Sequence, residues 1–165
     1  MDHFAIFSIT RSYKIDLKNL EKKYLDLQSK YHPDMARNED EMDEFLKISV
    51  FVNDAYKILK NDHSRAILML KAVDINPTEI KSSSDFLELM LEKSEFLDEA
   101  RTKEDVDEFT RSLESQYLST KMNLESAFER KEYELAQKRA IELKYLENIL
   151  NKARNKRYDT FDRNI

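Results

Sequence analysis

The sequence predicts an all-α protein that consists of an N-terminal helical hairpin and a C-terminal three-helix bundle. The 165 residues include no glycine and only two prolines, whereas tight β-hairpins and strand bulges depend on glycine. Charged residues make up 37% of the chain and apolar residues 41%, a balance typical of long amphipathic helices. Apolar residues recur at spacings of three and four along most of the chain, which is the period of a helix.

Composition also excludes several classes of function. Without cysteine there is no disulfide, no thiolate nucleophile and no cysteine-ligated metal, and without glycine there is no glycine-rich phosphate loop. No apolar run approaches the roughly 20 residues that span a bilayer, and the first residues show no secretory signal. The net charge of −5 disfavours nucleic-acid binding. We therefore expect a cytoplasmic protein that binds no cofactor, metal, membrane or nucleic acid.

The first elements are a short turn and an amphipathic helix. Residues 2–9 carry an apolar cluster and are expected to form a helical turn. Asp16 suits the N-cap of a helix over residues 16–31, and Pro33 ends this helix because the residue before a proline is pushed out of the α region. The apolar stripe of this helix is Leu17, Leu20, Tyr24, Leu27 and Tyr31. Its lysines lie away from that stripe: Lys18, Lys22, Lys23 and Lys30.

A polar loop over residues 33–43 is expected before the second helix. The stripe of the second helix is Phe45, Ile48, Val52, Ala55, Tyr56 and Leu59. Two such helices bury their stripes against each other, so they are expected to form an antiparallel hairpin. The connection, with His32 and Asp34, then lies exposed at one tip.

The best boundary in the chain follows a third, short helix. Asn61 and Asp62 mark a break, and the apolar residues after it are Ala66, Ile67, Met69, Leu70 and Val73. Residues 74–78 combine turn-forming residues with Pro77. These patterns divide the chain into a first module over 1–75, a linker over 76–84 and a second module over 85–165.

The second module is expected to contain helices over residues 85–101, 104–130 and 132–156, which form a small bundle. Thr102 and Asp105 are a weak variant of a capping box. The stripe of the middle helix is Val106, Phe109, Leu113, Tyr117, Leu124 and Phe128, and that of the last is Ala136, Ala140, Leu143, Leu146 and Leu150. The basic tail over 152–163 is expected to be frayed.

The turn at Tyr31-His32-Pro33-Asp34 allows three interpretations. A metal site is disfavoured because His3 and His63 lie far away in sequence and the loop lacks the spacing of a calcium loop. A catalytic site is disfavoured because Ser29, the nearest nucleophile, has no recognisable oxyanion hole. The plain structural interpretation is that His32 and Asp34 cap a helix end and begin a turn.

The context of the turn favours a different function. A helix with lysines on its outer face, the His-Pro-Asp sequence, a polar loop and a second amphipathic helix together resemble the J-domain of Hsp70 co-chaperones. This resemblance implies that the first module docks on an Hsp70 through His32, Pro33 and Asp34, and stimulates ATP hydrolysis there. By the same resemblance, Lys22, Lys23 and Lys30 contribute to Hsp70 binding. J-domains usually have a lysine after the aspartate, and Met35 at this position is a departure from the family pattern.

The chain as a whole resembles the HscB-type co-chaperones of iron–sulfur cluster assembly. The similarity rests on the start Met1-Asp2-His3-Phe4-Ala5-Ile6-Phe7, on the short J-domain and on the helical C-terminal half. The stretch from Phe86 to Glu99 is similar to the helix with which that family binds its scaffold protein. The resemblance implies an Hsp70 of the HscA type and the scaffold protein IscU as partners. The absence of a cysteine-rich segment favours the bacterial type.

Helical periodicity over 86–99 is compatible with such a surface. It predicts a core stripe of Phe86, Leu89, Met90, Phe96 and Leu97. Leu87 and Leu91 lie beside this stripe and acidic residues lie beyond it, which suits an apolar centre with a charged rim. On the last helix Tyr145 lies opposite the main stripe, in line with Ile141 and Ile149, which are expected to be core. Carried over by position, the scaffold-binding residues are Leu87, Leu91, Glu92, Glu95, Glu99 and Tyr145. Glu88 departs from the bacterial pattern, which more often has an apolar residue there.

The resemblance thus implies a non-enzymatic adaptor that stimulates the ATPase of an Hsp70 and delivers IscU to it. Two alternatives stay open. One is a J-domain protein that delivers a different client, and the other is a helical interaction protein without a chaperone partner.

Overall fold

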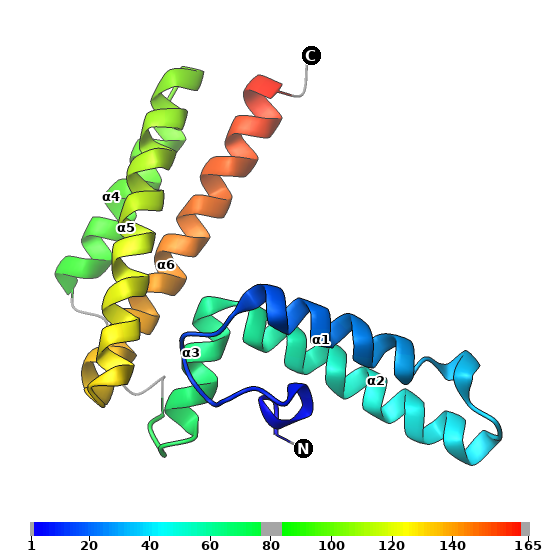
Figure 1. Ribbon diagram of the computed structural model, residues 1–165. Helices are drawn as coiled ribbons and strands as arrows, with labels where there is room; N and C mark the ends of the chain where they lie inside the picture. Colours follow the sequence, from blue (N-terminus) through cyan, green and yellow to red (C-terminus); the bar gives the residue numbers. More distant parts are fainter. Residues whose placement is uncertain (1, 77–83, 163–165) are drawn as a thin grey trace. The chain divides into compact units, whose positions relative to one another are not determined.

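The computed structural model describes residues 2–76 and 84–162, and these ranges contain helical elements and no strand. In chain order the elements are η1 (Ala5–Phe7), α1 (Leu17–Lys30), η2 (Pro33–Met35), α2 (Glu39–Lys60), α3 (Asp62–Lys71), α4 (Ser84–Glu99), α5 (Lys103–Glu129), α6 (Tyr133–Arg157) and η3 (Tyr158–Asp162) (Figure 1). The all-α prediction is confirmed. None of the helices in the described ranges combines the length and the apolar character needed to cross a membrane.

The chain divides into two compact units, Met1–Met69 and Leu70–Ile165. The predicted boundaries at 75 and 85 stay a prediction, because residues 77–83 of the expected linker lie outside the described residues. The last residue of that expected linker, Ser84, already belongs to α4.

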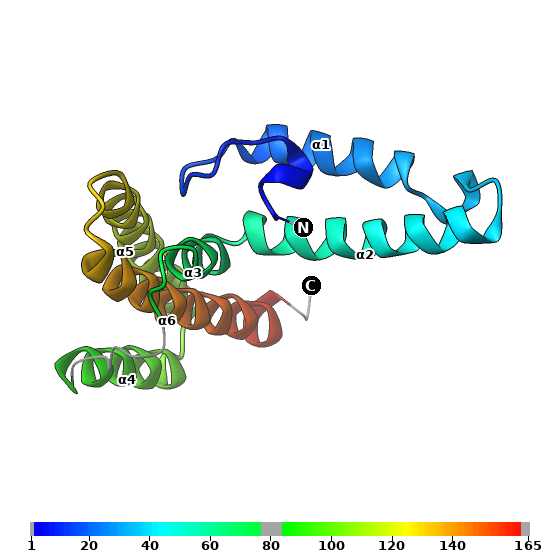
Figure 2. The same ribbon diagram turned by 90° about the horizontal axis from the view of Figure 1, so that it is seen from below.

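In the first unit, α1 and α2 form the expected antiparallel hairpin (Figures 1 and 2). Asp16 caps α1 and its carboxylate accepts from the backbone N–H groups of Lys18 and Asn19. Between the helices, the rings of Tyr24 and Tyr56 stack with centroids 4.0 Å apart. The central cluster of buried residues consists of Phe4, Phe7, Leu20, Val52, Ala55 and Leu59. The apolar cluster near the N-terminus therefore completes the core of the hairpin, which agrees with the predicted helical turn.

The second helix begins earlier than predicted. The expected loop over 33–43 ends at Asn38, whose side chain accepts from the Glu41 N–H at 2.8 Å and caps α2. The acidic residues that suggested a loop are the first turn of the helix. Negative charge is favourable there because it faces the positive end of the helix dipole.

The break at Asn61 is confirmed, and a buried arginine fixes the helix after it. The guanidinium of Arg65 is almost fully buried, and its Nε donates to the Tyr13 carbonyl at 2.7 Å. It also donates to the Leu59 carbonyl and lies over the Tyr13 ring. Helix α3 ends at Lys71, so Val73 lies beyond it and not within it as expected.

In the second unit, α5 and α6 pack as an antiparallel pair, with α4 beside them (Figures 1 and 2). Thr102 caps α5 as predicted, and its Oγ1 accepts from the Asp105 N–H at 3.1 Å. The turn between α5 and α6 places Lys131 in the left-handed region, with φ of 59°. Ser8 and Asp74 also have positive φ, so residues with a β-carbon occupy positions that glycine would fill without strain.

The prediction of a frayed tail is wrong for the part of it that is described. Helix α6 continues to Arg157, and the π-helical segment η3 extends it to Asp162. Lysine and arginine side chains of this stretch form ion pairs with acidic residues of α4, α5 and η3. Basic composition was therefore a poor guide to disorder, because the partner charges lie far away in sequence.

Candidate functional site

The His-Pro-Asp turn is shaped by hydrogen bonds between neighbouring residues. Pro33 is the first residue of η2, where its fixed φ suits the turn. The His32 carbonyl accepts from the Met35 N–H at 2.9 Å, and the Pro33 carbonyl accepts from the Ala36 N–H at 3.1 Å. His32 Nδ1 accepts from the Asp34 N–H at 3.3 Å and so caps the turn. The turn holds its shape through these contacts.

Both ionisable side chains of the turn are nevertheless open to solvent. The side chain of His32 is 59% exposed and that of Asp34 is 87% exposed, with 3.5 Å between Nδ1 and Oδ2. The capping interpretation and the docking interpretation are thus compatible, because Nδ1 caps the turn while the rest of the imidazole and the carboxylate face outward. Edge-to-face packing of Tyr31 on Phe45, with centroids 5.3 Å apart, joins the end of α1 to α2 next to this turn.

The three predicted lysines differ in their surroundings. Lys22 is exposed on α1, and the Lys30 ammonium lies 4.9 Å from the centre of the Tyr31 ring. The Lys23 ammonium instead donates to the Ser8 carbonyl at 2.8 Å and joins α1 to the turn after η1. Periodicity could not distinguish them, because the left-handed conformation of Ser8 that presents this carbonyl has no local sequence signal. Met35, where J-domains usually have lysine, is exposed.

The predicted scaffold-binding residues lie at the surface of the second unit. Leu87 is 42% exposed and Leu91 58% exposed, and Glu92, Glu95 and Glu99 are all exposed. Tyr145 on α6 is half-buried, with its ring edge-to-face against Phe86 at 5.5 Å. We call Leu87, Leu91, Glu92, Glu95, Glu99 and Tyr145 the α4 face. Two exposed leucines with acids around them provide an apolar centre and a charged rim.

The core side of α4 is narrower than predicted. Met90 and Leu97 are buried as expected, but Leu89 is 46% exposed and Phe96 49% exposed. Met90 and Leu97 are seven residues apart, so they define the direction that faces the bundle, and the other two lie to one side of it. Phe96 packs on Phe109 of α5, with ring centroids 4.9 Å apart. Helix α4 therefore carries exposed apolar side chains on both of its flanks.

The expected core role of the second stripe on α6 holds for Ile149, which is buried, whereas Ile141 is half-buried. Among the described residues, no group of three or more histidine and acidic side chains lies close enough to hold a metal ion.

Comparison with known proteins identifies both units. Residues 2–68 match the family model of the DnaJ domain, and residues 82–154 match that of the HSCB C-terminal oligomerisation domain. A co-chaperone protein HscB homolog of Neisseria meningitidis is 30% identical over 158 residues, which cover 90% of this chain and 95% of the relative. The chain belongs to the HscB family of co-chaperones.

Other HscB proteins agree with this assignment. The mouse iron–sulfur cluster co-chaperone protein HscB is 30% identical over 92% of this chain and 67% of its own length. The crystal structure of human co-chaperone protein HscB superimposes with a TM-score of 0.87, at 31% identity, over 94% of this chain and 82% of that chain. The turn at His32–Asp34 is therefore part of a J-domain, and the α4 face is part of the HscB C-terminal domain.

Proposed function

We propose that this HscB-type protein docks on an Hsp70 of the HscA type, accelerates its ATP hydrolysis and delivers the scaffold protein IscU to it for iron–sulfur cluster assembly. The observation that carries the proposal is the presence, in one chain, of a rigid exposed His-Pro-Asp turn and of an exposed apolar and acidic face on α4. The protein acts as an adaptor in the bacterial cytoplasm and contributes no catalytic group of its own.

The first half of the proposal concerns the Hsp70. The almost fully exposed Asp34 carboxylate is free to make a charge-assisted hydrogen bond with an arginine of the partner, and such bonds are stronger than neutral ones. Pro33 fixes the direction in which this carboxylate and the His32 imidazole point. Lys22 and Lys30 attract an acidic surface during approach, and Lys23 contributes mainly by holding α1 in place.

The second half concerns the scaffold. Leu87 and Leu91 supply the apolar centre of the interface, and the Tyr145 ring borders it from α6. The carboxylates of Glu92, Glu95 and Glu99 supply a rim that favours basic residues on the scaffold. Because one chain carries both surfaces, the scaffold reaches a high local concentration beside the Hsp70 without any new chemistry.

Single-turnover ATP hydrolysis by the cognate Hsp70 tests the proposal. We expect the protein alone to accelerate hydrolysis, and IscU to increase the acceleration further. If hydrolysis does not respond to the protein alone, the proposed Hsp70 partnership is wrong. In a parallel titration, IscU should bind the full-length protein in the absence of the Hsp70, and no binding would overturn the scaffold half of the proposal.

A second candidate is a J-domain protein that delivers a different client. The observation that favours it is Glu88, which is exposed on α4 at a position where the bacterial pattern more often has an apolar residue. In that case the protein alone stimulates the Hsp70, whereas IscU neither binds nor adds to the effect. The ATPase assay therefore separates the two candidates directly.

A further inference from the structure

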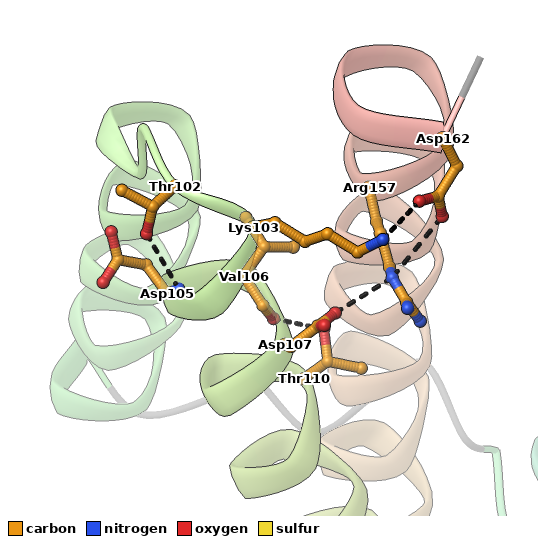
Figure 3. A network of polar contacts seen from close by, with 8 residues as sticks. All are labelled: Thr102, Lys103, Asp105, Val106, Asp107, Thr110, Arg157 and Asp162. Atoms are coloured by element: carbon orange, nitrogen blue, oxygen red, sulfur yellow. Dashed lines mark hydrogen bonds and ion pairs between the residues drawn. The ribbon is translucent and has the colours of Figure 1, made fainter. Parts of the chain in front are cut away.

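The basic end of α6 and the segment η3 connect to both other helices of the second unit. Figure 3 shows part of this network, in which Lys103 on α5 pairs with Asp162 at 2.7 Å. Arg157 pairs with Asp107 of α5 at 2.9 Å and with Asp162 at 3.5 Å. The hydrogen bond from Lys103 lowers the pKa of Asp162 from its ordinary value of 3.8, which favours the ionised carboxylate. These contacts fix the end of α6 against the start of α5.

Lys156, one residue before Arg157, contacts the C-terminal end of α4. Its ammonium donates to the Leu97 carbonyl and, at 2.9 Å, to the Asp98 carbonyl. The last carbonyls of a helix lack partners within the helix and carry the negative end of its dipole, so an ammonium is favourable at this position. Lys156 therefore acts as a C-terminal cap of α4 that is supplied from a different helix.

Lys152, one turn earlier on α6, contacts the side of α4. Its ammonium donates to Ser94 Oγ at 2.8 Å and to Asp98 Oδ2 at 2.7 Å. Ser94 is three residues after Leu91 and Asp98 is seven residues after it, so all three lie on the same flank of the helix. The Asp98 carboxylate is thus paired with Lys152 and does not belong to the acidic rim of the α4 face, which consists of Glu92, Glu95 and Glu99.

The apolar residues of α4 offer more than one side that could be buried. Met90 and Leu97 face the bundle, but Leu91 on one flank and Leu89 and Phe96 on the other offer alternative apolar sides. Hydrophobic burial is non-directional, so a rotated helix that buries either flank would be stabilised in a similar way. Hydrogen bonds require defined distances and angles, so the bonds from Lys152 to the side chains of Ser94 and Asp98 favour the rotation that turns this flank toward α6. The bonds from Lys156 hold the C-terminal end of the helix beside it.

We propose that Lys152 and Lys156 are positioning residues, which fix α4 in the rotation that exposes Leu87 and Leu91 to the scaffold. This inference rests on the proposed scaffold binding at the α4 face and adds a role for the basic stretch of α6. Neither lysine touches the scaffold. They increase the fraction of molecules in which α4 exposes Leu87 and Leu91.

The test compares full-length variants in which methionine retains the apolar stem of lysine but removes the charge. Lys152→Met with Lys156→Met should weaken IscU binding about tenfold, which is the effect of a presented fraction that falls to about one tenth. Hydrogen exchange of the amides over residues 90–99 in the free protein should become severalfold faster. Lys138→Met is the matched control, because Lys138 is exposed on α6 outside this network, and it should change neither quantity.

Two further readouts separate positioning from loss of fold. Acceleration of the Hsp70 without scaffold should be unchanged, and saturating IscU should restore the full acceleration, so that only the half-maximal IscU concentration shifts. Lys156→Arg retains a donor and should stay within about twofold of the original affinity, since an arginine also suits a helix C-terminus. If the double variant fails to fold, Lys156→Met alone is compared with Lys156→Arg in the same assays.

The outcomes are distinguishable. Unchanged IscU affinity in the double variant overturns the inference, whether or not amide exchange changes. If the original protein does not bind IscU, the proposed function fails first and the positioning role fails with it. Weaker binding together with faster exchange confined to α4 supports both.

Discussion

The two candidate docking surfaces are built in opposite ways. The hydrogen bonds that shape the turn at His32–Asp34 join residues two or three positions apart. The α4 face depends on Lys152 and Lys156, which reach residues of α4 that lie 54 to 59 positions earlier in the chain. One surface is therefore a property of a short segment, whereas the other is a property of a packed unit.

The two surfaces should therefore respond differently to amino-acid substitutions. A surface that is held by its own segment should be affected mainly by substitutions within it. A surface that is held by another helix should also be affected by substitutions that never touch the partner.

Asp34→Asn should lower the acceleration of Hsp70 ATP hydrolysis by at least tenfold and leave IscU affinity unchanged. The substitution removes the charge of a nearly fully exposed carboxylate, and a hydrogen bond to a charged group contributes about 1.5–3 kcal/mol. Single-turnover hydrolysis and an IscU titration measure the two effects. Asp43→Asn, an exposed acid on α2, is the control. Full acceleration by the Asp34→Asn variant would show that the turn is not the effector.

Leu87→Ala combined with Leu91→Ala should have the converse effect. We expect IscU affinity to fall about tenfold or more, because leucines at the centre of an interface bury apolar area on binding. Helicity, measured by circular dichroism, and acceleration of the Hsp70 without scaffold should be retained. Leu118→Ala with Met122→Ala is the matched control, since this exposed apolar pair on α5 has the same spacing. Loss of helicity in the α4 variant alone would mean that its leucines are core.

Lys22→Ala and Lys23→Ala should differ although they are adjacent. Lys22→Ala should slow association with the Hsp70 a few-fold at low salt, with a smaller effect at high salt, as expected for electrostatic steering. Lys23→Ala should instead lower the free energy of unfolding by about 1 kcal/mol, because it removes the bond to the Ser8 carbonyl. Stopped-flow binding and urea unfolding measure the two. Equal effects on association would contradict the distinction.

Asp162→Asn should slightly lower the melting temperature at neutral pH, and the difference should disappear in acid. Its pKa in the folded protein is lowered from 3.8 by the hydrogen bond to Lys103 and by the charges of Lys103 and Arg157. A lowered folded-state pKa means that the stabilisation is present above the unfolded value of 3.8 and is lost as pH falls through the folded value. Thermal melts at neutral pH and at a pH below the folded value check this for both proteins. A difference that persists in acid would exclude the ion pair as its cause.

The sequence was most informative where structure is local. The Asp16 and Thr102 caps and the break at Asn61 were all predicted, because each depends on a residue type and its immediate neighbours. The His-Pro-Asp turn was recognised for the same reason. Even there, the acidic start of α2 was misread as loop, since acids suit a loop and a helix N-terminus equally well.

The sequence was least informative where distant residues meet. The predicted core positions of Leu89 and Phe96 were wrong, because a helical wheel identifies an apolar stripe but not its centre when apolar residues cover three sides. The contacts of Lys152 and Lys156 were missed for a related reason. Nothing near them in the chain indicates that α4 ends beside them. The bond of Lys23 to Ser8 depends in the same way on a turn that sequence alone did not define.

The absence of glycine has a thermodynamic consequence beyond the choice of fold class. Side chains at every position restrict the unfolded ensemble, so less backbone entropy is lost when the chain folds. The left-handed turns at Ser8, Asp74 and Lys131 oppose this gain, since a β-carbon in that region costs roughly 1–2 kcal/mol. Lys131→Gly should remove that strain from the folded state. The added backbone freedom of glycine in the unfolded chain opposes folding by a smaller amount, about 0.5–1 kcal/mol, so thermal melts should show a melting temperature a few degrees higher.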